Sequence, residues 1–316
     1  MVAIPTRFHR QIVWTALLAC LFLPTISCDE GGSLPGLGDP LVTIVKEDSR
    51  FILADLSGDF YFVLRDNNGR TLYSKRGEMH IGGDHKITTP EGFFVQGYTI
   101  DENFRIQTNA RADMSIPLGT LQVKEATTKV TVEGNLSPND LKTGDSISTA
   151  FDVFDGKGNI VRVRITAMLS SVSETLAVWD VIFARNQDSS LLGSEIYVFN
   201  TDGSLEIDPQ LMITVGDDAS SPPIHIDFRL VRGNRSLASE IAVSAEDGAP
   251  VGTLEDYAIE GLGIISGFFS NGLVRNLGRL VVALIRNPET LIPESAGVFS
   301  LGPETAEPFI TTPSNL

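Results

Sequence analysis

The sequence predicts an all-β protein built from two β domains. Short apolar or alternating segments recur along the chain, and clusters of Gly, Asn, Asp and Pro separate them, which is the pattern of strands and turns. After the first 28 residues, no segment shows a convincing helical repeat of apolar residues. The length of 316 residues suits roughly two domains, and 42% hydrophobic against 20% charged residues is a globular composition.

The predicted strands follow one another at short intervals. The clearest is 161–165, where polar and apolar side chains alternate after the turn from Asp155 to Asn159. The run 280–285 is apolar throughout and is predicted to be buried on both faces. Before it, Asn271-Gly272 favours a tight hairpin, because Asn-Gly readily adopts positive φ. The other predicted strands are 60–64, 71–74, 93–98, 129–133, 178–183, 196–199, 224–228 and 264–269.

Residues 1–27 are predicted to be an export signal. Arg7 and Arg10 form a basic start, and an apolar stretch follows over 12–26. This stretch contains Pro24 and is short for a membrane span, which needs about 20 apolar residues. A basic start, a short apolar core and a small residue before a cysteine are typical of a secretory signal. Residues 28–40 are polar and rich in Gly and Pro, so they are predicted to be a flexible tether.

Cys28, between the signal and the tether, resembles the acylated cysteine of a bacterial lipoprotein. Thr25 stands where that motif usually has Leu. Cys20 is the alternative, because 17–20 match the motif better, but cleavage there would leave an apolar start. An ordinary signal without a lipid is a third possibility. Both cysteines of the chain lie in this leader, so the body is predicted to have no disulfide, no cysteine-based zinc site and no cysteine nucleophile.

Charge and motifs predict neither an enzyme nor a nucleic-acid-binding protein. The net charge of −16 would repel nucleic acid and anionic lipid, so membrane contact is expected only through a lipid anchor. His80, His85 and His225 form no metal motif. The turn that starts at Asp155 differs from a calcium loop, with Ile160 where Gly is needed. No Gly-x-Ser-x-Gly motif is present. We therefore predict no catalytic residues, no metal and no cofactor.

An ordered set of signals near the C-terminus resembles a known family. The set consists of Asp247-Gly248, Gly252-Thr253-Leu254, Glu260-Gly261, Phe269-Ser270-Asn271-Gly272, Leu277-Gly278 and Asn287-Pro288. This order is similar to the C-terminal core segment of bacterial flagellar hook proteins. Further segments that resemble the hook and rod family, in the family's order, are 58–77, 87–98, 134–136, 151–159 and 199–205, with Trp179 before the last. Ser74-Lys75 replace the usual Thr in the first of these.

The resemblance implies a particular domain organisation. A discontinuous inner hook-like β domain would comprise 41–140 plus 240–308. An outer domain, shaped as a β-barrel or sandwich, would be inserted at 145–238, and 309–316 would form a tail. Hook and rod proteins begin and end with long helices, which this sequence replaces with a signal and a polar end, and they normally leave the cell through the flagellar export channel. The isolated body, 41–316, is therefore expected to associate weakly and to form no tubes by itself.

The resemblance also implies a function. The protein is expected to be a structural component of the flagellar hook or basal body that works by protein–protein packing in motility. Its expected partners are flagellar axial or basal-body proteins, or other envelope proteins. The expected location is the cell envelope, in the periplasm or lipid-anchored at the outer membrane, in association with the flagellum. The alternative function is a lipid-anchored envelope binding module that reuses the hook-like fold, and a third is an envelope hydrolase.

Overall fold

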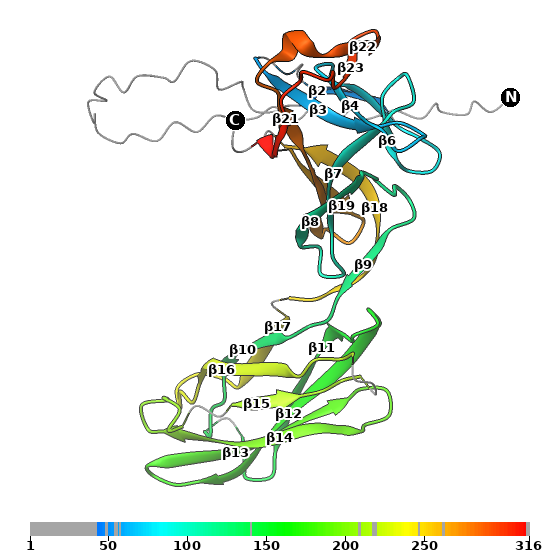
Figure 1. The fold of residues 1–316 in the computed structure, drawn as a ribbon. Coiled ribbons are helices and arrows are strands. Elements are labelled where there is room, and N and C mark those ends of the chain that lie inside the picture. Colours follow the sequence, from blue (N-terminus) through cyan, green and yellow to red (C-terminus); the bar gives the residue numbers. More distant parts are fainter. Residues whose placement is uncertain are drawn as a thin grey trace, which may run out of the picture. The chain divides into compact units, whose positions relative to one another are not determined.

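The computed structural model describes residues 43–313, except 48–49, 54–55, 57, 140, 208–209, 217–219, 246 and 261–262. Over these residues the secondary structure is β throughout apart from one short 3-10 helix, Pro288–Thr290, so the all-β prediction is confirmed. The strands gather into two lobes with separate cores (Figure 1). We call 43–125 with 249–311 the split lobe, and 129–245 the inserted lobe. Cys20 and Cys28 lie outside the described residues.

The split lobe contains the strands before and after the insertion. They are β1 (Thr43–Glu47), β2 (Arg50–Leu53), β3 (Phe60–Arg65), β4 (Thr71–Ser74), β5 (Glu78–Ile81), β6 (Ile87–Thr88), β7 (Phe94–Ile100), β8 (Ile106–Asp113), β9 (Gln122–Glu125), β18 (Ala249–Ile259), β19 (Ile264–Phe269), β20 (Val274–Leu280), β21 (Val282–Leu284), β22 (Ile292–Ser295), β23 (Val298–Ser300) and β24 (Phe309–Thr311). They form one connected sheet system, in which β7 pairs with β20, β3 with β21 and β4 with β23. The two separated segments therefore fold as one unit.

The apolar run 280–285 is buried on both faces, as predicted, because it lies between two cores. Leu280 and Val282 belong to a large core with Phe62 and Leu64, whereas Val281 and Ala283 pack in a smaller one. The run is not one strand, however. Leu280 pairs with Gly97 of β7, and Val282 pairs with Phe62 of β3. The chain changes partner at Val281, so the ladder is interrupted there.

The inserted lobe is a sandwich of two four-stranded sheets. One has the order β15 (Leu211–Ile213), β16 (Ile224–Arg232), β10 (Lys129–Asn135), β17 (Glu240–Ala245), and the other runs in chain order through β11 (Ser146–Phe154), β12 (Ile160–Val172), β13 (Leu176–Arg185) and β14 (Leu191–Asn200). β10 and β16 are parallel and every other pair is antiparallel. Trp179, Phe183 and Phe228 are fully buried between the sheets. In β12 the predicted alternation holds, with Val163 and Ile165 buried.

Strands β10 and β17 share the core of the inserted lobe. They pair with each other, and β10 also pairs with β16. Their side chains Val130, Val132 and Ile241 pack in the same apolar cluster as Trp179. The strands of this lobe therefore begin before residue 145 and continue after residue 238.

A five-residue turn recurs through both lobes. The N–H of its first residue donates to the C=O of its fifth, and the N–H of its fourth donates to the C=O of its first. The fourth residue has positive φ, which suits glycine. Turns with this bonding span 66–70, 82–86, 89–93, 101–105, 155–159, 200–204 and 269–273. In the turns that start at Asp66, Asp101 and Asp155, the carboxylate also accepts the N–H groups of the third and fifth residues.

Candidate packing surfaces

The outer face of the sheet β11–β14 is apolar along β13 and β14. Side chains alternate across a sheet, and the buried row of β13 consists of Ala177, Trp179, Val181 and Phe183. The opposite row faces outward, and there Val178 lies opposite Val198 and Asp180 opposite Ile196. We call Met168, Val178, Ile182, Ile196 and Val198 the apolar outer face. Ile182 is 39% exposed and Ile196 is 58% exposed.

Asp180 is the one acidic residue in the centre of this face. Met168 lies opposite it on β12 and Ile196 on β14. The hydroxyl of Ser170 donates to its carboxylate at 2.5 Å. Toward β11 the same face becomes polar, with Ser146, Ser148 and Asp152 on that strand. The face thus combines an apolar half with a polar half, which resembles the apolar core and polar rim of a protein interface.

The edge of β14 is less suited to binding a neighbouring protein than the apolar outer face is. Val181 lies opposite Glu195, so Glu195 belongs to the row whose neighbours on β13 point inward. An inward-pointing charge on an edge strand opposes the addition of a further strand. In addition, β14 bonds to the following segment, where Glu206 N–H donates to Val198 O at 2.8 Å. Packing on the sheet face is therefore favoured over packing on the edge.

A second surface, the Asn135 groove, lies at the end of the other sheet and has a volume of about 770 Å³. The Asn135 carboxamide donates to the C=O groups of Asn234, Leu237 and Ala238 at 3.0–3.3 Å and accepts the N–H of Asn234 at 2.8 Å. These bonds fix the loop after β16. Leu230 (55% exposed) and Leu237 (57% exposed) line the groove. The groove is therefore a preformed apolar depression.

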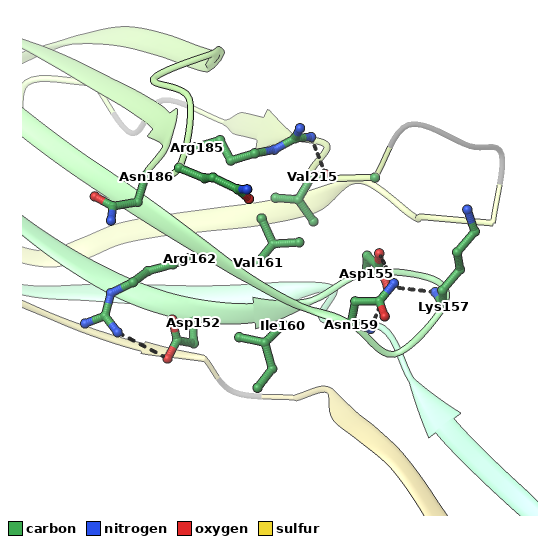
Figure 2. Close-up of a pocket in the computed structure, with 12 residues that line it drawn as sticks. Asp152, Asp155, Lys157, Asn159, Ile160, Val161, Arg162, Arg185, Asn186 and Val215 are labelled. Carbon is green, nitrogen blue, oxygen red and sulfur yellow. Dashed lines mark hydrogen bonds and ion pairs between the residues drawn. The ribbon is translucent and has the colours of Figure 1, made fainter.

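A polar recess of about 580 Å³ lies at one end of β11 and β12 (Figure 2). Its charges are engaged with one another or with backbone. Arg162 lies 3.7 Å from the Asp152 carboxylate, and Arg185 donates to Val215 O at 2.9 Å. Asp155 accepts the N–H groups of Lys157 and Asn159 at 2.8 Å each, as a turn residue does. Among the residues that the structure describes, the two carboxylates that line the recess, Asp152 and Asp155, are thus held by an ion pair and by turn bonds respectively.

The three histidines that the structure describes have different surroundings. His80 contacts the Thr88 hydroxyl at 3.0 Å on β5 and β6, and His225 contacts Gln210 at 3.0 Å on β16. His85 occupies the fourth position of a turn with φ 64°. Within the part of the chain that the structure describes, no three His, Cys, Asp or Glu side chains are placed to hold a metal ion. No helix among those residues is long and apolar enough to cross a membrane.

The apolar outer face is not apparent from the sequence alone. Ile182 and Ile196 lie in the predicted strands 178–183 and 196–199, but these predictions do not state which row of side chains is buried. The available signal is the charged Asp180 between Val178 and Ile182, which marks their row as the one that faces solvent. It is weak, because both rows of β13 are mainly apolar.

Comparisons with known proteins agree with the architecture. Residues 55–136 match a family model described as the D1 domain of the flagellar hook protein FlgE/F/G. The chain is 25% identical to the flagellar hook protein FlgE of Salmonella typhimurium over 85% of this chain and 72% of the relative. It is 24% identical to FlgE of Borreliella burgdorferi over 74% of this chain and 60% of the relative. The crystal structure of Helicobacter pylori FlgE2 superposes with a TM-score of 0.51 at 12% identity, over 84% and 92% of the two chains.

Proposed function

We propose that this chain, a structural protein of the flagellar hook kind, works by packing its β lobes against neighbouring subunits of the flagellar axis. The observation that carries the proposal is the extent of the similarity. FlgE of Salmonella typhimurium aligns over 85% of this chain, which is more than either lobe alone comprises. The fold similarity extends over 84% of the chain. Structural packing requires an exposed surface rather than a catalytic pocket, and the inserted lobe offers one in its apolar outer face.

The apolar outer face is the surface of the inserted lobe that best suits a neighbouring subunit. Burying apolar area contributes about 25 cal/mol per Å². The exposed isoleucines Ile182 and Ile196 are diagonal neighbours across β13 and β14, and they therefore provide a favourable centre for a contact. A stable interface needs about 1,000 Å² in total, which exceeds what these side chains supply. The contact would extend over the polar half of the same face, toward Ser148 and Asp152.

The inserted domain that we propose extends beyond the segment 145–238 on both sides. Thr127 and Asp247 mark its borders, because Asp247 accepts the N–H groups of Thr128 (2.7 Å) and Lys129 (3.0 Å). Just outside these residues, Glu125 pairs with Ala249 between β9 and β18. The two ends of the insertion are thus adjacent. We place the insertion at about 128–247.

The envelope location and the lipid anchor rest on the sequence of residues 1–40. We propose that the signal is cleaved and Cys28 is acylated, which would hold the protein at a membrane surface of the envelope. Palmitate labelling of the full chain in a bacterial host is expected to tag the protein, and Cys28→Ala is expected to abolish the label. A label that persists in Cys28→Ala and disappears in Cys20→Ala would move the site to Cys20.

Co-sedimentation with purified hook–basal bodies tests the packing proposal. The wild-type chain should pellet with these structures, and Ile196→Lys should weaken pelleting about tenfold or more, because a desolvated lysine disfavours an apolar contact. Thr143→Lys is the matched control, since it adds the same charge to an exposed turn residue of the inserted lobe that lies outside this face. Absence of pelleting by the wild type would contradict the hook-like function. Equal pelleting by Ile196→Lys would contradict only the choice of face.

A further inference from the structure

The chain contains two Asn-Gly steps, Asn68-Gly69 and Asn271-Gly272, which occupy the same turn. In both, the glycine has φ 83° and its N–H donates to the C=O three residues earlier, at 3.1 Å and 2.9 Å respectively. In both, the N–H of the first turn residue donates to the C=O of the fifth at 3.0 Å. The two asparagines therefore share one backbone geometry.

The side chains of the two asparagines differ. The Asn271 carboxamide donates to Pro250 O at 2.7 Å and Val123 O at 3.2 Å, and its oxygen accepts the N–H of Leu273 at 3.1 Å. Asn68 is exposed, and among the described residues its carboxamide has no hydrogen-bond partner. Only its backbone N–H is engaged, with the Asp66 carboxylate at 2.9 Å. The Asn271 carboxamide is thus held by three hydrogen bonds, whereas none holds that of Asn68 among the described residues.

We propose that Asn68 is a site of spontaneous deamidation in the folded protein and that the hydrogen bonds of Asn271 protect the second Asn-Gly step. Hydroxide removes the proton of the Gly69 backbone nitrogen, which attacks Cγ of Asn68. The bond from Cγ to the side-chain nitrogen breaks, this nitrogen takes a proton from water and leaves as ammonia, hydroxide is regenerated, and a succinimide forms. Water then opens this ring at either carbonyl, giving aspartate or isoaspartate. No oxidant or reductant is needed.

The attack requires the carboxamide to turn toward the backbone nitrogen of the next residue. Glycine assists, because it has no side chain to hinder the approach and it moves readily between conformations. The bond from Gly69 N–H to Asp66 O has to open, but the equivalent bond has to open at Gly272 as well. The difference between the sites is therefore the three side-chain bonds of Asn271, which have to break before its Cγ can be attacked.

The products would change the β3–β4 turn. Deamidation adds a negative charge next to the buried carboxylate of Asp66, which Arg70 contacts at 2.7 Å. Isoaspartate also lengthens the main chain by one carbon, so the two backbone bonds of the turn could not both keep their geometry. Because β3 pairs with β4, β7 and β21, the modification would act on a central strand of the split lobe.

Incubation of the purified full chain at mildly alkaline pH, followed by peptide mapping with mass spectrometry, tests the proposal. In the folded protein, Asn68 is expected to deamidate at least about tenfold faster than Asn271, because three hydrogen bonds have to be broken at the latter. In urea, the two sites are expected to react at similar rates. Equal rates in the folded protein, or an Asn68 that reacts only in urea, would overturn the proposal.

Gly252→Ala provides a second, independent test. A Cβ at Gly252 would lie 2.3 Å from Cγ of Asn271 and would displace that side chain from its acceptors. Deamidation at Asn271 is then expected to rise severalfold while the rate at Asn68 is unchanged, with circular dichroism to confirm that the variant is folded. An unchanged rate at Asn271 in the folded variant would show that the hydrogen bonds are not the source of protection.

Discussion

At the scale of single residues, Asp113 illustrates how the split lobe accommodates a largely buried charge. Its carboxylate accepts hydrogen bonds from Arg65 at 2.6 and 2.7 Å, from Gln96 at 2.7 Å and from Lys86 at 2.9 Å. Arg65 and Lys86 also lie over the ring of Phe94, at 4.9 and 4.7 Å from its centre. The hydrogen bond from Arg65 is the largest cause that holds the pKa of Asp113 well below its ordinary value.

Asp113→Asn is expected to lower the free energy of unfolding by about 2 kcal/mol at pH 7, because three donors lose a charged acceptor. The pKa of Asp113 is lowered in the folded state. Its contribution is therefore present above the ordinary carboxyl pKa and is lost as the pH falls toward the folded value. Urea unfolding at neutral and acidic pH measures this. Glu102→Gln, at an exposed turn position, is the control. Equal stability of Asp113→Asn and wild type would contradict the expectation.

Asp227 is the corresponding acid of the inserted lobe. Bonds from Arg229 lower its pKa from 3.8 to about 2. The unfolded chain therefore binds the proton first, and this contribution to stability is lost between about pH 4 and pH 2. We expect Asp227→Asn to lose on the order of 1 kcal/mol at pH 7, since the Arg229 partner is exposed. In thermal melts across this pH range, the melting temperatures of the wild type and of Asp227→Asn should converge as the pH falls. A constant difference would contradict the assignment.

At the scale of elements, the recurrent turn contains two kinds of glycine, which differ in backbone conformation. Gly69 has φ 83° and open space around it, whereas Gly83 has equally open space without a positive φ. We expect Gly69→Ala to destabilise the protein by about 1 kcal/mol, because an L side chain is strained in the left-handed region. Gly83→Ala should be nearly neutral. Chemical unfolding of the two variants compares them directly, and equal effects would show that φ is not the cause.

The strands that could be predicted from sequence are those with a clear pattern. In β12, Val163 and Ile165 alternate with arginines, and the strand is found where the alternation predicts it. The break at Val281 could not be predicted, because it depends on a change of partner from β7 to β3. Phe104 at φ 59° could not be predicted either. Its ring packs at 6.4 Å from that of Phe269, so tertiary contact fixes a conformation that an aromatic residue rarely adopts.

The candidate packing surface was less predictable than the fold. The two rows of β13 are both mainly apolar, so periodicity alone does not tell which faces the core. The second sheet decides this by covering Trp179 and Phe183 and leaving Ile182 outside. The pairing of distant strands, which no local pattern encodes, thus determines the exposed surface. The family resemblance, in contrast, depends on ordered turn motifs and was visible in the sequence.

At the scale of the whole molecule, the separate cores imply that the split lobe folds without the insertion. Replacing 128–247 by a short Gly/Ser linker is expected to leave a cooperative thermal transition, because Glu125 and Ala249 are already paired. Replacing only 145–238 is expected to give a less cooperative transition, since Val130, Val132 and Ile241 would lose the core in which they are buried. Calorimetry and binding of a hydrophobic dye compare the two. A cooperative, dye-free 145–238 deletion would contradict the wider border.

The pairing of β3 with β21 has a consequence for the timing of folding. Phe62 can pair with Val282 only after the whole inserted lobe, which lies between them in the sequence, has been synthesised. During synthesis, the inserted lobe can complete its sandwich while β3, β4 and β7 still lack their later partners. Contacts distant in sequence form slowly, so we expect two refolding phases, with the fluorescence of buried Trp179 recovering first. Until the C-terminal strands are synthesised, the unpaired apolar strands of the split lobe can associate with other chains. The risk of such association therefore depends on how fast the last third of the chain is synthesised.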